Sequence, residues 1–170
     1  MRGDAGHARQ TTMDPESGAR HGLGIEGVLA LPLKQFRDER GAVYQMLKCT
    51  DEHFLQFGEI YFSTVRKGAI KAWKNHSRVT VSYACVSGLL RMVLFDDRPG
   101  SRTRGVVEEA RIGPESYFLI VIPPGIWNGF QGLSDADAVL ASCPTEPVDV
   151  TEFARLEPYS DRIPYQWPAP

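Results

Sequence analysis

The sequence predicts an all-β fold, a sandwich or barrel, formed by one domain. Short apolar runs recur at spacings of about 8–12 residues, and turns rich in glycine or proline separate them. Sustained helical periodicity is confined to one short segment. The chain has 170 residues, which suits one ordinary core, and 42% of them are hydrophobic, so that core can be well filled.

The first 23 residues are expected to be a disordered tail. This stretch is polar, contains many Gly, Arg and Ser residues, and has neither hydrophobic periodicity nor the apolar run of a secretory signal. Met1 and Met13 are both possible starts of translation, so the tail has two possible lengths. The folded domain is expected to span residues 24–170.

In the first half of the domain, apolar or alternating segments predict strands over Val28–Leu33, Ala42–Leu47, Ile60–Val65 and Ala69–Trp73. The clearest alternation follows, and one of its faces carries Val79, Val81, Tyr83 and Cys85. The residues between these are small or polar, as in a strand with one buried face. Ser87-Gly88 then signals a hairpin, with Leu89–Phe95 as its return strand.

In the second half, further strands are predicted over Val106–Ile112, Tyr117–Ile122, Ile126–Phe130 and Ala138–Ser142. One helical segment is expected over Val150–Leu156. Thr151 can cap its N-terminus, and Glu152 lies in its first turn, where a negative charge is favoured. The expected architecture is therefore all-β with one short C-terminal helical segment.

The charge balance excludes a partner bound mainly by electrostatics. The 19 Lys and Arg residues against 21 Asp and Glu residues give a formal net charge of −2, which provides no attraction to nucleic acid or to an anionic membrane. No apolar run is long enough to span a bilayer. Cys49, Cys85 and Cys143 are widely spaced and form no CxxC pair, so buried free thiols in a reducing cytoplasm are expected.

Histidine is scarce in the folded domain. Of the four histidines, His7 and His21 lie in the predicted tail, which leaves His53 and His76 as candidates for acid–base chemistry. A site with several histidine ligands is therefore not expected, and neither a metal nor another cofactor is predicted.

The segment Ile60–His76 is the strongest candidate site. Four cations are interleaved there with aromatic and apolar residues, and Lys71 is predicted to share a strand face with Trp73. A lysine beside a tryptophan on an inward face would bind an anion, whereas on an outward face it would contact only water. The pattern leaves both interpretations open.

Arg91 presents a similar choice. It alternates with Val93 and Phe95, so it lies on an otherwise apolar face and could hold a phosphate or carboxylate in bidentate fashion. An ion pair with Asp96 or Glu108 would explain its position equally well.

Several motifs occur together in an order that points to one family. SGLLRMVLFDDRPGSRT is similar to the pattern G-x-V-x-D-V-x-x-D-x-R-x-x-S-P-T, and LIVIPPGIWNGFQGL is similar to I-P-x-G-x-x-H-G-F. The pattern N-x-S-x-x-x-x-G-x-x-R-G-x-H aligns without a gap over residues 61–74, and SDRIPYQWP resembles D-x-x-x-I-x-W-P. These are the motifs of the RmlC-like cupins, the dTDP-4-dehydrorhamnose 3,5-epimerase family.

The resemblance covers residues 24–168 and implies a cupin jelly roll, a double-stranded β-helix, that forms a homodimer. Members of this family epimerise a dTDP-4-keto-6-deoxyhexose by removing protons next to the ketone. Such chemistry needs a base near the carbon, a donor for the enolate oxygen and an acid on the opposite face of the sugar. The resemblance therefore implies a nucleotide-sugar epimerase or isomerase that uses no cofactor.

Laid residue by residue onto this chain, the family's site is altered. Its base His falls on Lys74, the Asp that orients the base falls on or beside Asp161, and its second His falls on Asn128. Its Arg falls on Lys71, which keeps the charge but loses the bidentate fork. Its Tyr acid falls near Ala141.

Either His76 or Lys74 is expected to move the proton. His76 follows Lys74 by two residues and so shares its strand face, and it resembles the second His of the H-x-H pattern in related ketoisomerases. Burial near other cations would lower the pKa of Lys74 toward neutrality. Asp161 completes the candidate catalytic set. The candidate substrate-binding residues are Lys71, Arg91, Arg98, Tyr61, Ser63, Asn128 and Trp167.

A second hypothesis keeps the fold without the reaction. In it, the chain is a catalytically silent cupin that binds a sugar nucleotide or supports a partner enzyme of deoxysugar biosynthesis. The replaced His and Tyr positions favour this alternative.

Overall fold

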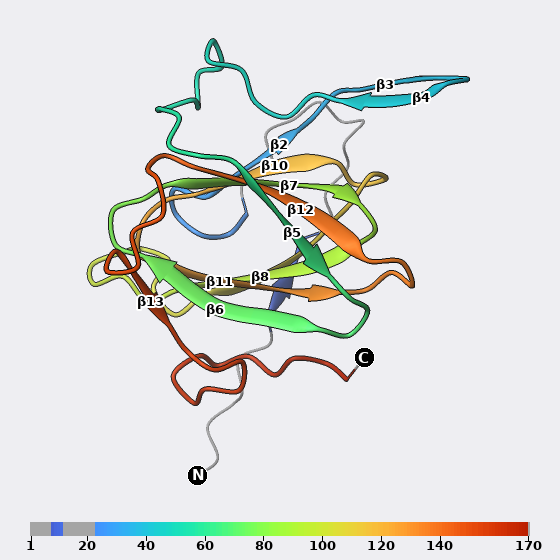
Figure 1. Ribbon diagram of the computed structural model, residues 1–170. Helices are drawn as coiled ribbons and strands as arrows, with labels where there is room; N and C mark the ends of the chain where they lie inside the picture. The colour runs from blue at the N-terminus through green and yellow to red at the C-terminus, as the bar shows by residue number, and fades with distance from the viewer. Residues whose placement is uncertain (1–7, 12–22, 170) are drawn as a thin grey trace.

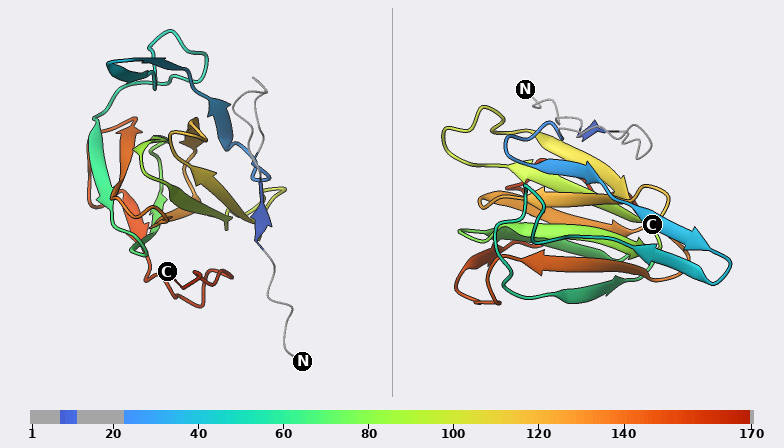
Figure 2. Two further views of the ribbon diagram at one scale, coloured as in Figure 1. Left: turned by 90° about the vertical axis from the view of Figure 1, so that its right-hand side faces the viewer. Right: turned by 90° about the horizontal axis from the view of Figure 1, so that it is seen from above.

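Two facing β-sheets and a projecting hairpin make up the fold (Figures 1 and 2). The computed structural model describes residues 8–11 and 23–169. One sheet has the order β1-β9-β8-β11-β6-β13, the other has the order β2-β10-β7-β12-β5, and β3 pairs with β4 in the hairpin. The strands β1 to β13 are, in order, Arg9–Gln10, Leu29–Pro32, Gln35–Asp38, Gly41–Tyr44, Tyr61–Val65, Ile70–His76, Val81–Ser87, Leu90–Asp96, Val107–Ile112, Phe118–Ile122, Ile126–Gly132, Ala138–Pro144 and Phe153–Arg155.

The main core lies between the two sheets, as the predicted jelly roll requires. Alternate residues of the strands enter it, so the period-2 pattern of the sequence becomes an inner and an outer face. In β7, for example, Tyr83 and Cys85 join this core while Ala84 packs on the outer face. The same alternation fills the core from β8 and β10, with Leu90, Met92, Leu94, Phe118, Ile120 and Ile122.

The C-terminal segment covers the outer face of the six-stranded sheet. It runs beneath this sheet in Figure 1, and its Ile163, Tyr165 and Trp167 pack against Trp73 and Trp127. On the opposite side of the molecule, the chain that follows the hairpin packs on the outer face of the five-stranded sheet. Both sheets are therefore largely buried on two faces.

The predicted helix over Val150–Leu156 was wrong. Its first residues form turns, and Phe153–Arg155 form β13, which pairs antiparallel with β6. A short local capping signal could not compete with a ladder that satisfies the backbone groups along the edge of β6. The described residues include no helix of the length and apolar character that a membrane crossing needs.

Part of the predicted tail takes part in the fold. Arg9–Gln10 form β1, which pairs in parallel with β9. Residues 1–7 and 12–22 of the predicted tail lie outside the described residues.

A β-bulge in β6 decides which way its side chains point. The register with β11 shifts so that residues 72–73 oppose the single residue Gly129. In a regular strand, residues three apart point to opposite faces, but the extra residue of the bulge restores a common direction. Lys71 and Lys74 consequently face the same space between the sheets.

The tight contact at this bulge generates a stability prediction. A Cβ on Gly129 would lie 2.5 Å from the Cβ of Ala72 and 3.2 Å from Cζ2 of Trp167. The Ala72 methyl cannot rotate away, so Gly129→Ala should lower the free energy of unfolding by about 1–3 kcal/mol. Urea denaturation should show a lower midpoint at an unchanged slope.

The double variant Gly129→Ala/Ala72→Gly is the matched control. It removes the opposing methyl and should recover part of the lost stability. Wild-type stability of Gly129→Ala alone would show that the bulge is not tightly packed.

Candidate active site

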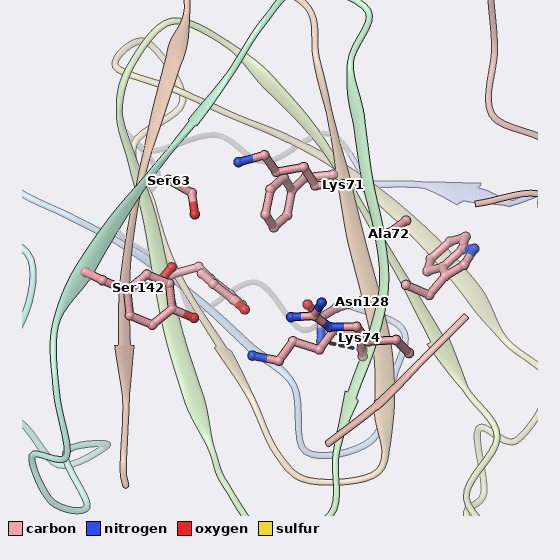
Figure 3. A pocket seen from close by; sticks show the side chains of 11 residues that line it. Ser63, Lys71, Ala72, Lys74, Asn128 and Ser142 are labelled. Atoms are coloured by element: carbon pink, nitrogen blue, oxygen red, sulfur yellow. Dashed lines mark hydrogen bonds between the residues drawn. The ribbon is translucent and has the colours of Figure 1, made fainter. Parts of the chain in front are cut away.

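A pocket of about 360 Å³ opens between the two sheets (Figure 3). The six-stranded sheet contributes residues from β6, β11 and β13, and the five-stranded sheet contributes residues from β5, β7 and β12. Tyr83 and Phe130, whose rings meet edge to face at 6.3 Å, also pack against the main core and so separate it from the pocket. The lining residues are Tyr61, Ser63, Lys71, Ala72, Trp73, Lys74, Tyr83, Asn128, Phe130, Ser142 and Arg155.

One wall of the pocket is basic. Lys71 and Lys74 come from β6, and Arg155 comes from β13, where it pairs directly with Lys74. Lys71 and Arg155 are exposed, whereas Lys74 is half-buried. No carboxylate is among the described lining residues, so this wall suits an anionic ligand.

The opposite wall carries hydroxyl groups. Tyr61 and Ser63 come from β5, and Ser142 pairs with Tyr61 across the ladder between β12 and β5. Figure 3 shows Ser63 and Ser142 facing Lys71, Lys74 and Asn128 across the pocket. Burial raises the pKa of Tyr61, against the opposing effect of its hydrogen bond with Ser142, so its phenol stays protonated at neutral pH.

Lys74 is the basic group whose protonation the site perturbs. Burial lowers the pKa of its amine, and the nearby positive charge of Arg155 lowers it further, while Glu152 and Glu59 act in the opposite direction. The Lys74 Nζ also lies 4.1 Å from the ring centre of Phe153, a contact that favours the charged form. Burial and Arg155 nonetheless lower the pKa of Lys74 below that of an ordinary surface lysine, so the amine gives up its proton more readily.

Asn128 supports this wall from β11. Its Nδ2 donates to the carbonyl oxygen of Lys74 at 3.0 Å, and the side chain is buried at the pocket. The amide thus fixes the backbone that carries Lys74.

His76 does not line this pocket and lies at a smaller neighbouring cavity, which Lys74 and Tyr61 also line. The ring is buried, and its Nδ1 lies 2.5 Å from Oε2 of Glu152. Burial and the nearby charge of Lys74 lower the pKa of His76, and the hydrogen bond with Glu152 only partly offsets them. Lys74 and His76 share the inner side of β6, as their spacing predicted.

Of the residues proposed from the sequence, the structure brings six to this region. Lys71, Lys74, Tyr61, Ser63 and Asn128 line the pocket, and His76 lies at the neighbouring cavity. Lys71 faces inward, although its side chain remains exposed at the mouth. The prediction that Trp73 shares its strand face was wrong, because the bulge leaves Trp73 in the outer cluster.

Two proposed arginines lie elsewhere. Arg91 faces the outer side of the six-stranded sheet, where its Nε donates to Glu109 at 2.9 Å and its Nη1 donates to Gln131 at 2.6 Å. Arg98 binds the buried Asp96 through Nε and Nη2, both at 2.9 Å. Both guanidinium groups thus have structural partners, and the ion pair expected between Arg91 and Asp96 or Glu108 is made with Glu109 instead.

Asp161 and Trp167 also lie outside the pocket. Both belong to the C-terminal segment on the outer face, where Asp161 is exposed and Trp167 packs at 5.1 Å from the Trp73 ring. The β6 strand itself separates this face from the basic wall. No described contact joins Asp161 to Lys74.

Sequence reasoning missed Arg155 and Glu152, because both were assigned to the predicted helix. Only the pairing of β13 with β6, about 80 residues apart in sequence, brings them beside Lys74 and His76. Tyr83 and Ser142 were recognised only as strand residues. The alternation of apolar residues along this strand did place Tyr83 on a buried face, and this was the one sequence signal of its position.

Comparison with known proteins gives a consistent result. The dTDP-4-dehydrorhamnose 3,5-epimerase family model matches residues 22–167. The dTDP sugar isomerase from Desulfovibrio desulfuricans G20 is 38% identical, with a TM-score of 0.83, and the match covers 85% of this chain and 93% of that one.

Two curated relatives are similar over most of their length. The probable low-salt glycan biosynthesis epimerase of Haloferax volcanii is 29% identical over 143 residues, which is 83% of this chain and 88% of the relative. The spore coat polysaccharide biosynthesis protein SpsL of Bacillus subtilis is 30% identical over 147 residues, which is 83% of this chain and 90% of the relative.

Proposed function

Since the chain belongs to the dTDP-4-dehydrorhamnose 3,5-epimerase family, we propose that it inverts a carbon next to the ketone of a dTDP-4-keto-6-deoxyhexose. One observation carries this proposal: the pocket has amines on one wall and hydroxyl groups on the other. A sugar ring between these walls has a base on one face and an acid on the other. Removal of a proton from one face and its return to the other inverts the carbon.

Lys74 is the proposed base. The 4-ketone makes the neighbouring C–H bond acidic, and the neutral amine of Lys74 takes this proton while electrons move to the ketone oxygen. The lowered pKa of Lys74 makes its neutral form available. The developing enolate is stabilised by the positive charge on the same wall.

Tyr61 is the proposed acid. It projects from the opposite sheet, its phenol is protonated, and Ser142 holds its oxygen. It therefore takes the role for which the aligned position near Ala141 offers no suitable side chain. Donation of its proton to the far face of the enolate completes the inversion at that carbon.

Lys71 and Arg155 are the proposed contacts for the diphosphate. Both are exposed at the pocket, where a negatively charged group can reach them from solvent. A diphosphate there leaves the sugar to enter toward Lys74, which is more deeply placed. Their distribution thus orients the nucleotide sugar with its ring inward.

A homodimer is also proposed. β5 is the edge strand of its sheet, and no strand of the described chain pairs with its free side. Ile60 and Phe62 are 51% and 62% exposed there, and Phe57 just before them is 63% exposed. Such an apolar strand edge favours pairing with a second copy.

The free thiols support a cytoplasmic location. Cys85 and Cys143 are buried, as predicted, whereas Cys49 is exposed, and all three are unpaired. An exposed free thiol is most compatible with a reducing compartment, and we therefore propose a cytoplasmic location.

The first prediction concerns the reaction. With dTDP-4-keto-6-deoxyglucose in D2O, NMR should show deuterium entering C3, C5 or both. Lys74→Gln removes the base and should slow this exchange by about 10²–10⁴-fold. Lys67→Gln is the matched control and should exchange normally, because Lys67 is exposed and pairs with Asp135 at 2.6 Å.

Absence of exchange above a buffer blank in the wild-type protein would exclude this reaction for the tested sugar. Thermal stabilisation by the same compound without exchange would instead support the silent, sugar-nucleotide-binding cupin.

The second prediction concerns pH. Lys74 must lose its proton to act, so the exchange rate should rise with pH through the lowered pKa of this amine. Arg155→Met removes a neighbouring positive charge, which raises the pKa of Lys74 and moves the rising limb to higher pH. Lys71→Met is the matched control: it should weaken substrate binding without moving the limb. If the exchange rate rises at the same pH in Arg155→Met and in the wild-type protein, the assignment of Lys74 as the base is wrong.

The third prediction concerns assembly. Light scattering after gel filtration should give twice the chain mass for the wild-type protein. Phe62→Lys places a charge on the proposed interface and should give the single-chain mass. Val150→Lys changes a residue that is 74% exposed in another loop and should remain dimeric. A wild-type protein of single-chain mass would rule out the homodimer.

A further inference from the structure

Next to the pocket lies a second cavity of about 10 Å³, the space of roughly one water molecule. Lys74 and Tyr61 line both cavities, so each side chain lies at the boundary between them. His76 and Glu152 line only the second cavity. A buried histidine therefore shares this cavity with the proposed base and the proposed acid.

The His76 side chain is 9% exposed and Glu152 is 2% exposed, with 2.5 Å between Nδ1 and Oε2. Within the described part of the chain, the other ring nitrogen, Nε2, is buried and has no hydrogen-bond partner. A buried nitrogen without a partner is costly and therefore calls for a role.

Glu152 determines which nitrogen carries the proton. Its Oε1 accepts the backbone N–H groups of Arg78 at 2.9 Å and Val79 at 3.1 Å. Burial alone would raise the pKa of Glu152, but these N–H groups and His76 lower it, so the group is an ionised acceptor. Nδ1 of neutral His76 must then donate to it, which leaves Nε2 with a free electron pair.

The proposed reaction creates a need for such a group, and this inference rests on that reaction. Each inversion leaves Lys74 with one proton too many and Tyr61 with one too few. The next molecule cannot react in the same direction until the amine has lost this proton and the phenolate has regained one. The two side chains face each other across the sugar, so the bound substrate blocks a direct transfer.

We propose that His76 is a proton relay, held in position by Glu152, that returns the proton from Lys74 to Tyr61 through the second cavity. Nε2 takes a proton from the Lys74 ammonium group, and the resulting imidazolium is stabilised by the Glu152 carboxylate. Nε2 then gives the proton to the Tyr61 phenolate. Afterwards Lys74, His76 and Tyr61 are all neutral, and no proton is gained or lost overall.

The other ionisable groups around the cavity have partners of their own. Glu146 and Asp149 also line it, and both bind Arg78, at 2.8 Å and 3.1 Å. The carboxylate in contact with the His76 ring is therefore that of Glu152 alone among the described residues.

His76→Gln tests the relay by separating the first turnover from later ones. In rapid-quench experiments with dTDP-4-keto-6-deoxyglucose, one equivalent of product per site should form at the wild-type rate, and later turnovers should be at least tenfold slower. His53→Gln is the matched control, since His53 also faces a carboxylate, Asp51 at 3.9 Å, but lines neither cavity. It should keep the wild-type rate throughout.

Glu152→Gln tests the positioning role. The side-chain oxygen of glutamine can still accept the Arg78 and Val79 N–H groups, while its NH2 group must donate to Nδ1 of His76. The proton of the ring then moves to Nε2, and the variant should show the same one-equivalent burst. In ¹⁵N NMR, the His76 signals should change from the Nδ1–H tautomer of the wild-type protein to the Nε2–H tautomer.

Three results would overturn the relay. They are an Nε2–H tautomer in the wild-type protein, an unchanged steady-state rate in His76→Gln, or a first turnover slowed as much as the later ones. The tautomer measurement needs neither substrate nor a variant. It therefore decides the relay separately from the proposed function, which fails if the wild-type protein exchanges no deuterium.

Discussion

The arrangement of side chains around the pocket depends on the β-bulge in β6, where two residues oppose Gly129. The bulge turns Lys71 and Lys74 to the same inner space and leaves Trp73 in the outer cluster. There the Trp73 indole N–H donates to the carbonyl of Pro158 at 3.0 Å, and the ring packs against the C-terminal segment. One local irregularity therefore both builds the basic wall and anchors the segment that covers its back.

The three cations of this wall differ in their exposure to solvent, and in the proposed mechanism this difference gives them two different roles. Lys71 and Arg155 stay in contact with water, so they remain charged and can attract an anion. Lys74 is further inside, where burial and the charge of Arg155 both favour the neutral amine. The proposed diphosphate contacts at the mouth and the proposed proton acceptor inside thus differ in their exposure to solvent.

The sequence predicted the fold well because alternation and turn residues act locally, and β7 is the clearest case. Motif order also pointed to Lys71, Lys74, Tyr61, Ser63 and Asn128, which line the pocket. Alternation alone would put Lys71 and Lys74 on opposite faces, and no local pattern revealed the bulge that turns both inward. Arg91 and Trp167 went to the other face because no local pattern reveals which side of a sheet the C-terminal segment will cover. Arg155 and Glu152 were missed because β13 exists only through its pairing with a distant strand.

A lysine in place of the family's histidine changes what its surroundings must provide. A carboxylate that orients a histidine base would stabilise the charged form of a lysine and hold its proton. The exposed position of Asp161, without a described contact to Lys74, is therefore consistent with the proposed lysine base. Arg155 at the neighbouring position of β13 acts in the opposite sense and favours release of the proton. A carboxylate–histidine pair is present nearby, as Glu152 and His76, which line the second cavity together with Lys74 and Tyr61. In the proposed mechanism, acid–base capacity thus depends on the combination of an exposed arginine, a half-buried lysine and a buried histidine.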